Sequence, residues 1–381
     1  MIDNSREVVA NLLKIPTNTI VLEQNATTAV NTILKNITWN DDCRDEIIYF
    51  NTIYGACGKT IDYLVDSLAG RVAAREVVIK YPCEDDEIVA AFKSAVDQSK
   101  SAGKRPKICM YDTVSSLPGV RFPFEDLTRE CKEAGIFSLV DGSQGIGMID
   151  LNLSELDPDF FLTNCHKWLH VPRGCAALYV PLRNQWIITT TTPTSHGYVA
   201  KTNKRFNPLP ESDKSNFVLN FEFTGTVDRS PYLCIPAAIN WRRDVLGGED
   251  RIMRYTQKLA KEGGKRAAQI LGTEVLDNPS GSMSNCSMTN VALPIRLVAP
   301  PETNGPDQGN IIPSEDGVVA REWMNRKLIS DYRTFVALFR YNDRIWARIS
   351  AQVYLDIGDF EWAGRVLLEL SGRVTRGEYK S

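Results

Sequence analysis

Short apolar runs alternate with amphipathic stretches through the large N-terminal part of the chain, and this alternation constrains the fold more than any other feature. The stretches 87–99 and 124–134 repeat apolar residues at helical spacing. Between such stretches, apolar runs of strand length occur at 20–22, 46–50, 77–79, 107–111, 136–140, 160–163 and 175–180. Strands that alternate with helices form a largely parallel sheet covered by helices. The sequence therefore predicts an α/β fold.

A change of composition after a long helical pattern predicts a second domain. The helical pattern covers 250–271 and is interrupted by Gly263 and Gly264. The chain that follows is rich in Ser, Asn, Gly and Pro, which is typical of loops, before strand and helix patterns return. We therefore expect a large domain at 1–262, which includes a connecting helix, and a smaller C-terminal α/β domain at 263–381.

The composition of this 381-residue chain argues against several classes of function. A formal net charge of -3 gives no electrostatic basis for nucleic acid or an anionic membrane as the main partner. The longest apolar stretches are too short to cross a bilayer, and the N-terminus lacks the apolar core of a secretory signal. The nine cysteines are scattered without a CxxC pair, which indicates reduced thiols rather than a metal site. We therefore expect a cytoplasmic protein.

An acidic residue and a lysine stand at the ends of two predicted strands. Asp141 directly follows the strand at 136–140, at the sheet edge where α/β proteins bind ligands, although an Asp there can also open a turn. Lys167 lies between His166 and Trp168, surroundings that suit a surface lysine poorly. Pyridoxal phosphate (PLP) chemistry needs both groups. The amine carries the aldehyde carbon, and the carboxylate keeps the pyridine nitrogen protonated.

The two motifs together resemble class V of the fold-type-I PLP enzymes. This family includes cysteine desulfurases, isopenicillin N epimerase and the C–S lyases of ergothioneine synthesis. The motifs are Asp-Gly-Ser-Gln at 141–144 and His-Lys-Trp at 166–168, and the resemblance covers most of the chain. It implies a fold-type-I PLP-dependent transferase fold, with Lys167 as the Schiff-base lysine and Asp141 and His166 as further catalytic residues.

The resemblance also implies which residues hold the cofactor. Thr27 and Thr28 open a predicted helix, whose N-terminal N–H groups suit a phosphate, with plain helix capping as the alternative. Tyr54 is implied to stack on the pyridine ring. The alternative is a hydrophobic residue that packs the next helix in place. Gln144 is implied to hydrogen-bond the phenolic oxygen, and Asn164 to contact the cofactor on its phosphate side.

Three further residues are implied to bind the substrate or a second subunit. Arg348 is the candidate for a substrate carboxylate, with an ion pair to Asp343 as the alternative. His196 is a candidate substrate contact or simply a polar loop residue. Thr226 resembles part of a loop that reaches the phosphate of the neighbouring subunit, with an ordinary turn at Gly225 as the alternative. The resemblance thus implies a homodimer with shared active sites.

The reaction is less constrained than the cofactor. With Lys167 as the base, removal of the α-proton can lead to β-elimination of a C–S bond, to epimerisation, or to attack of a thiol on sulfur. A desulfurase needs a reactive cysteine on a late loop, and Cys234 and Cys286 do not lie in such a pattern. The strongest resemblance is to fungal hercynylcysteine sulfoxide lyases and isopenicillin-N-epimerase-like enzymes, in segments 54–60, 194–198, 224–232 and 348–354. We therefore predict a PLP-dependent C–S lyase that acts on a cysteine conjugate, such as hercynylcysteine sulfoxide in ergothioneine synthesis.

Two alternative functions remain. The first is an isopenicillin-N-epimerase-like PLP enzyme of fungal secondary metabolism, or a cysteine-desulfurase-like one. The second is a truncated, non-catalytic PLP-fold protein, because family members usually carry a further N-terminal segment over the active site. The retained Asp141, His166 and Lys167 favour an enzyme. The expected partners are a small amino-acid-like substrate and a second copy of the chain, without nucleic acid or membrane.

Overall fold

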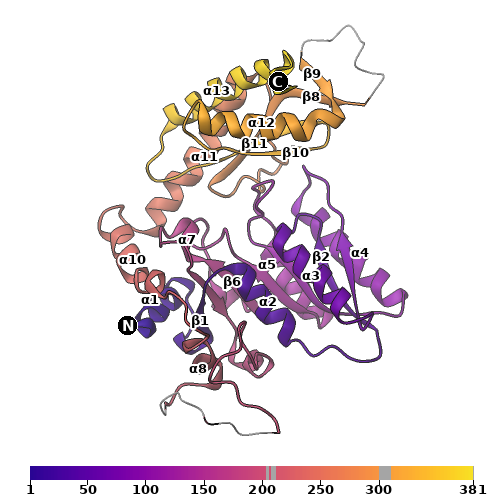
Figure 1. The fold of residues 1–381 in the computed structure, drawn as a ribbon, viewed down its shortest axis with the longest axis vertical. Helices are drawn as coiled ribbons and strands as arrows, with labels where there is room; N and C mark the ends of the chain where they lie inside the picture. The colour runs from indigo at the N-terminus through magenta and orange to yellow at the C-terminus, as the bar shows by residue number, and fades with distance from the viewer. Residues whose placement is uncertain (203–205, 207–211, 300–309, 381) are drawn as a thin grey trace. The chain divides into compact units, whose positions relative to one another are not determined.

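The chain forms two compact units in a computed structural model that describes residues 1–202, 206, 212–299 and 310–380. The first unit comprises Met1–Ser115 and Phe122–Glu249, and the second comprises Ser116–Arg121 and Asp250–Ser381. In Figure 1 the first unit is coloured mainly indigo to magenta and the second mainly orange to yellow. Along the chain, the division falls between Glu249 and Asp250, at the start of the helix that contains the expected boundary at 262/263. The short loop Ser116–Arg121 belongs to the second unit although its neighbours in sequence belong to the first.

A seven-stranded sheet forms the centre of the first unit, in the order β1-β7-β6-β5-β4-β2-β3. The strands β2 to β6 run parallel to one another, whereas β7 runs antiparallel to both β1 and β6. The expected mostly parallel α/β sheet is thus confirmed. Its strands are β1 (Ile20–Glu23), β2 (Asp45–Phe50), β3 (Val72–Val77), β4 (Arg105–Asp112), β5 (Phe137–Asp141), β6 (Phe160–Asn164) and β7 (Ala176–Tyr179).

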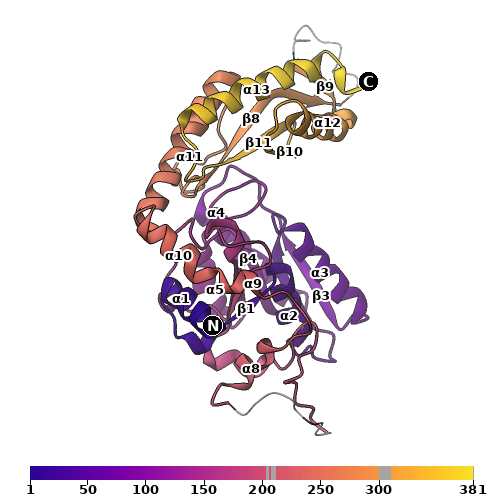
Figure 2. The same cartoon turned by 60° about the vertical axis from the view of Figure 1, so that its left-hand side comes forward.

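Helices cover both faces of this sheet (Figures 1 and 2). Met110 of β4 joins a buried cluster with Ile33 and Ile61, whereas the next residue, Tyr111, hydrogen-bonds Thr128 at 2.8 Å on the other face. Burial on both faces explains why the strands read as continuous apolar runs. The helices are α1 (Ile2–Leu13), α2 (Ala26–Asn36), α3 (Gly55–Ser67), α4 (Asp85–Ser101), α5 (Phe124–Ala134), α6 (Leu153–Leu156), α7 (Cys165–Trp168), α8 (Asn216–Glu222), α9 (Ser230–Leu233) and α10 (Ile235–Asp244).

One local expectation for the first unit was wrong. The strand expected at 77–79 lies at Val72–Val77 instead, because β3 is an edge strand whose side chains alternate between buried and exposed. Such a strand lacks a continuous apolar run, and Val78, which suggested one, is exposed. Lys167 lies in a single turn of helix, α7, directly after β6.

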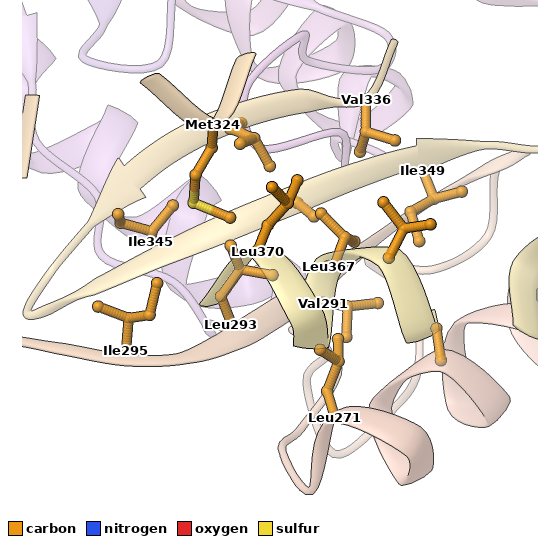
Figure 3. Packing of buried hydrophobic residues seen from close by; sticks show 14 of the residues in the cluster. Leu271, Val291, Leu293, Ile295, Met324, Val336, Ile345, Ile349, Leu367 and Leu370 are labelled. Atoms are coloured by element: carbon orange, nitrogen blue, oxygen red, sulfur yellow. The ribbon is translucent and has the colours of Figure 1, made fainter. Parts of the chain in front are cut away.

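The second unit contains a four-stranded sheet in the order β10-β11-β8-β9, in which only β8 and β9 pair in parallel. Figure 3 shows its core, where Leu271, Met324 and Leu367 from three helices gather around Val291 and Ile345 of the sheet. The strands are β8 (Met288–Val298), β9 (Ile311–Pro313), β10 (Ala337–Tyr341) and β11 (Arg344–Ser350). The helices are α11 (Glu249–Leu271), α12 (Gly317–Ser330) and α13 (Ile357–Thr375).

The expected interruption of the long helix at Gly263 and Gly264 is also wrong, because α11 continues through both residues. Both glycines are buried, and each leaves room for a neighbouring side chain. A Cβ atom at Gly263 would overlap the ring of Phe360, and one at Gly264 would overlap Thr289. The two glycines therefore permit close packing of α11 and do not end the helix.

Candidate active site

Two carboxyl groups lie side by side at the carboxyl edge of the large sheet. Asp112 ends β4 and Asp141 ends β5, and the two residues are direct partners in the parallel ladder. Partner residues in neighbouring strands project to the same face, so both carboxyl groups share one environment. Both are buried, at 8% and 2% exposure. Asp141 accepts hydrogen bonds from the Ser143 N–H at 2.9 Å and from the Cys57 thiol at 3.8 Å.

Lys167 lies at the same edge because α7 follows directly on β6, which is the parallel neighbour of β5. Its side chain is half-buried, and its positive charge acts on both Asp112 and Cys57. The fold thus brings together Asp141 and Lys167, as the sequence suggested, and adds Asp112 and Cys57 to the group.

The electrostatics of this group favour the protonated form of two of its members. Burial raises the pKa of Asp112 well above the usual carboxyl range, and the charge of Asp141 raises it further, while Lys167 acts in the opposite direction. Burial also raises the pKa of the Cys57 thiol, with Asp141 and Asp112 adding to the effect. These shifts favour the protonated form of Asp112, whose carboxyl group can then donate a hydrogen bond.

His166 is held by the backbone of Cys175. Its Nδ1 lies 2.7 Å from the Cys175 carbonyl oxygen and 3.2 Å from the Cys175 nitrogen, so either tautomer has a partner there. Burial lowers the pKa of His166, the charges of Lys167 and Arg173 lower it further, and the Cys175 carbonyl opposes this. The imidazole is therefore neutral at neutral pH, with a fixed orientation beside the lysine.

Gln144 and Asn164 are each oriented through their amide oxygen. The Trp168 indole N–H donates to Gln144 Oε1 at 2.8 Å, and the Ala26 N–H donates to Asn164 Oδ1 at 3.0 Å. Both side chains are buried. Because each oxygen already accepts a hydrogen bond, the NH2 group of each amide is the group oriented to donate to a ligand.

The N-terminus of α2 is capped by Asn25, which the sequence analysis treated as the alternative role for this motif. Asn25 Oδ1 accepts from the Thr28 N–H at 2.8 Å and from the Thr28 hydroxyl at 3.1 Å. Thr28 therefore takes part in capping, whereas Thr27 is half-buried in the same first turn. The Ala26 N–H contact to Asn164 joins this helix start to the end of β6.

The remaining predicted residues lie outside the strand-end group. Tyr54 caps α3 and is 50% exposed, so its ring is accessible. His196 is exposed and packs against Phe223, with ring centroids 4.7 Å apart. Thr226 is exposed in the loop between α8 and α9. Arg348 belongs to β11 of the second unit, where it bonds to Ser116 rather than to Asp343.

The sequence analysis missed Asp112 and Glu23, although both follow the rule that identified Asp141. Each is an acidic residue that ends a buried strand. Burial raises the pKa of Glu23 to about 8, opposed by the Gln24 N–H and by the Thr32 hydroxyl. Glu23 lies two residues before the cap of α2, so it is a neutral acid beside the helix start. Cys57 carried no recognisable signal in the sequence.

This set of donors fits PLP. A lysine amine and a carboxylate share one sheet edge, as an aldehyde and a pyridine nitrogen require. The α2 N-terminus offers N–H donors and the positive end of a helix dipole for a phosphate. A neutral Glu23 adds no negative charge that would repel the phosphate. The fold and this edge define a fold-type-I PLP enzyme.

The chain belongs to the class-V aminotransferase family, whose model matches residues 1–295. An L-cysteine desulfhydrase-like protein, lolT1, from Epichloe uncinata is 39% identical over 96% of this chain and 83% of its own length. The hercynylcysteine sulfoxide lyase of Schizosaccharomyces pombe is 29% identical over 95% of this chain and 82% of its own length. The predicted family, the enzymatic nature of the chain and PLP as its cofactor are thus confirmed.

A solved structure supports the fold independently. The cystine C–S lyase C-DES, in complex with cysteine persulfide, matches with a TM-score of 0.70 and 17% identity, covering 97% of this chain and 86% of that chain. Among the described residues, no helix is long and apolar enough to cross a membrane. The cytoplasmic location stays a prediction.

Proposed function

We propose that this enzyme is a C–S lyase that catalyses β-elimination on a cysteine conjugate such as hercynylcysteine sulfoxide. The observation that carries the proposal is the shared position of Lys167 and Asp141 at one edge of the sheet. The two curated relatives support the reaction class, since one is named for L-cysteine desulfhydrase and the other for hercynylcysteine sulfoxide lyase.

The elimination balances without an oxidant or a reductant. Bound PLP supplies a sink for the electron pair that is left when a bond to Cα breaks. The Lys167 amine takes the Cα proton, and the Cβ–S bond then breaks with its electron pair leaving on sulfur. The sulfur fragment leaves as a thiol, or as a sulfenic acid from a sulfoxide. The remaining 2-aminoacrylate takes up water and yields pyruvate and ammonia.

The residues around Lys167 have separate roles in this proposal. Asp141 faces the pyridine nitrogen and keeps it protonated. The NH2 group of Gln144 donates to the phenolic oxygen, because its Oε1 is already engaged by Trp168. His166 is neutral and fixed by Cys175, so it orients the cofactor without adding positive charge beside the lysine.

The phosphate and the ring face have their own contacts in the proposal. The α2 N-terminus binds the phosphate through Thr27 and Thr28, and Asn164 donates its NH2 group on the same side. Tyr54 stacks on the ring. Thr226 reaches the phosphate of a second copy of the chain, so the active enzyme is a homodimer. Analytical sedimentation tests this last point, and a fully active monomer would rule out shared sites.

Arg348 binds the substrate α-carboxylate in this proposal, and His196 contacts the substrate from its exposed loop. The half-buried guanidinium of Arg348 suits a bidentate interaction with a carboxylate. A desulfurase is disfavoured, because burial raises the pKa of the Cys286 thiol to about 11 and leaves it protonated and enclosed. Replacing the partly exposed Cys234 by serine should leave the lyase activity intact, whereas a desulfurase that used this thiol would be inactivated.

Absorbance of the purified protein tests the cofactor lysine. The wild-type protein should show an absorbance band near the edge of the visible range that disappears on borohydride reduction. Lys167→Ala should lack this band. Lys132→Ala is the matched control, because Lys132 is an exposed lysine paired with Asp157 in the same unit. A Lys167→Ala protein that keeps a borohydride-sensitive band would contradict the assignment.

The elimination itself is tested by measuring pyruvate release and loss of optical activity on the same cysteine conjugates. Pyruvate without racemisation supports the lyase. Racemisation without pyruvate would replace it with an epimerase of the isopenicillin-N-epimerase type. A protein that binds PLP but shows neither reaction would favour the non-catalytic alternative.

A further inference from the structure

Asn290 and Arg348 are neighbours across two strands of the second unit. They are direct Cα partners in the antiparallel pairing of β8 with β11. Residues that are directly opposite in such a pair project from the same face of the sheet, with Cβ atoms about 5 Å apart. Both side chains contact the loop Ser116–Arg121, which belongs to the same compact unit.

Asn290 holds this loop at Gly119 through both ends of its amide. The Gly119 N–H donates to Asn290 Oδ1 at 2.8 Å, and Asn290 Nδ2 donates to the Gly119 carbonyl oxygen at 2.9 Å. Two residues later, the Arg121 N–H donates to the Met283 carbonyl oxygen at 2.9 Å. Asn290 is 1% exposed, so solvent does not compete for these bonds. The loop is therefore fixed against β8.

The fixed loop in turn holds Arg348 at two places. Arg348 Nη1 donates to the Ser116 carbonyl oxygen at 2.6 Å and lies 3.3 Å from the Ser116 hydroxyl. The aliphatic part of the arginine lies against Gly119, where a Cβ atom would stand only 2.8 Å from Arg348 Cδ and 3.1 Å from Cγ. The lack of a side chain at residue 119 is thus required for the observed course of the arginine.

One hydrogen-bond donor of the Arg348 guanidinium lacks an acceptor among the described residues. Arg348 Nε is buried and has no hydrogen-bond partner in the part of the chain that the structure describes. A buried, unpartnered donor on a cation is costly unless a ligand satisfies it. Burial also lowers the pKa of Arg348, as expected for a cation kept from water. Because Nη1 is held by Ser116, the edge formed by Nε and Nη2 is the one available to a carboxylate.

We propose that Asn290 is a positioning residue for the substrate carboxylate: by holding Gly119 and its loop, it directs the Nε–Nη2 edge of Arg348 toward the α-carboxylate of an amino-acid substrate. This inference rests on the proposed role of Arg348 in carboxylate binding. It also narrows the substrate class, because an amine that lacks the α-carboxylate gains nothing from the oriented arginine.

Two small probes separate carboxylate binding from the chemistry of the substrate side chain. Aminooxyacetate and O-methylhydroxylamine both react with a lysine-bound PLP carbonyl, but only the first carries a carboxylate. The measured quantity is the ratio of their second-order rate constants, followed by the change in cofactor absorbance of the PLP-loaded enzyme. Arg348→Ala should reduce this ratio, and Asn290→Ala should reduce it by about tenfold, the loss typical of one misaligned charge-assisted hydrogen bond. The rate with O-methylhydroxylamine should not change in either variant.

The control is Asn36→Ala. Asn36 holds Thr190 by the same pair of bonds, accepting from the Thr190 N–H at 3.0 Å and donating to its carbonyl oxygen at 2.8 Å. Asn36→Ala should lower thermal stability as Asn290→Ala does, but it should not change the ratio of the rate constants for the two probes. Gly119→Ala is a second, independent variant, because its Cβ atom displaces the arginine while Asn290 is retained. It should reduce the ratio even if Asn290→Ala fails to fold.

The outcomes distinguish the two levels of the proposal. An unchanged ratio in Arg348→Ala overturns the carboxylate role of Arg348 and the positioning role of Asn290 with it. A reduced ratio in Arg348→Ala, with an unchanged ratio in folded Asn290→Ala, or in Gly119→Ala where Asn290→Ala does not fold, overturns only the positioning role of Asn290. A reduced ratio in Asn290→Ala, or in Gly119→Ala where Asn290→Ala does not fold, supports the positioning role when Asn36→Ala keeps the wild-type ratio.

Discussion

Replacement of Arg242 by methionine should destabilise the first unit far more than any exposed charge replacement. Arg242 lies in α10 with a side chain that is 0% exposed. Its Nε and Nη2 donate to the two carboxylate oxygens of Glu249 at 2.6 Å and 2.5 Å. Its Nη1 donates to the Trp168 carbonyl oxygen at 2.6 Å, and its Nη2 to that of Gly147 at 3.3 Å. The arginine therefore ties α10 to the end of α7, next to Lys167.

The size of the destabilisation follows from the groups that Arg242→Met leaves without a hydrogen-bond donor. Methionine fills most of the volume but leaves the Glu249 carboxylate and two carbonyl groups without their donor. Removing one partner of a buried ion pair costs about 3–5 kcal/mol. The Glu249 side chain is 23% exposed, so water offsets part of this, and the lower end, about 3 kcal/mol, is expected. For a unit of this size that corresponds to a fall in Tm of roughly 6–12 °C.

Thermal unfolding followed by circular dichroism measures this effect, with Arg243→Met as the matched control. Arg243 is the next residue in α10, and the side chains of its ion pair with Asp244 are 65% and 60% exposed, so the loss of this pair should leave the melting temperature close to that of the wild type. Adding Glu249→Gln to Arg242→Met should recover part of the loss, because the unpaired charge is removed. Equal melting temperatures for Arg242→Met and Arg243→Met would refute the reasoning.

Three further predictions concern other buried groups. Glu23 is protonated when folded, with a pKa of about 8, and ionised when unfolded above its ordinary 4.5, so stability should fall between about pH 5 and pH 8 by up to about 1.4 kcal/mol per pH unit. Glu23→Gln should flatten this slope in melting curves, and parallel slopes would contradict the assignment. Gly264→Ala should cost about 1–3 kcal/mol in denaturant unfolding, because its Cβ atom meets Thr289 inside a continuous helix, and an unchanged midpoint would be inconsistent with that packing. Asp141→Asn should lower kcat by roughly 100-fold. Asp112→Asn should stay near the wild-type kcat, since burial favours the neutral form of Asp112, and a comparable loss in both variants would show that Asp112 is ionised.

The sequence was sufficient for the residues whose placement depends on local rules. Asp141 and Lys167 were identified because each ends a recognisable strand or follows one directly, and the carboxyl ends of parallel strands meet at one edge. The same rule applies to Asp112 and Glu23, which stand at the ends of β4 and β1. These two were therefore predictable. What the sequence does not display is their depth of burial, which is what keeps them protonated.

Contacts between distant segments were beyond such rules. The bonds that join Gly119 to Asn290 and Ser116 to Arg348 connect residues 171 and 232 positions apart. They depend on the register of β8 against β11, which shifts between Arg344 and Trp346. A one-residue change of register would turn Asn290 or Arg348 to the other face of the sheet. No periodicity in the chain specifies where such a shift occurs.

The carboxyl pair at the sheet edge makes sense as an electrostatic arrangement around a single lysine. Two buried carboxylates beside one ammonium would leave a net negative charge in a region with little water, which is unfavourable. Burial favours a protonated Asp112, and its protonation removes this excess. The Cys57 thiol, whose pKa is raised, donates to Asp141 and does not add a third anion. Asp141 is therefore the carboxyl group of this pair that we propose as the partner of a pyridinium nitrogen.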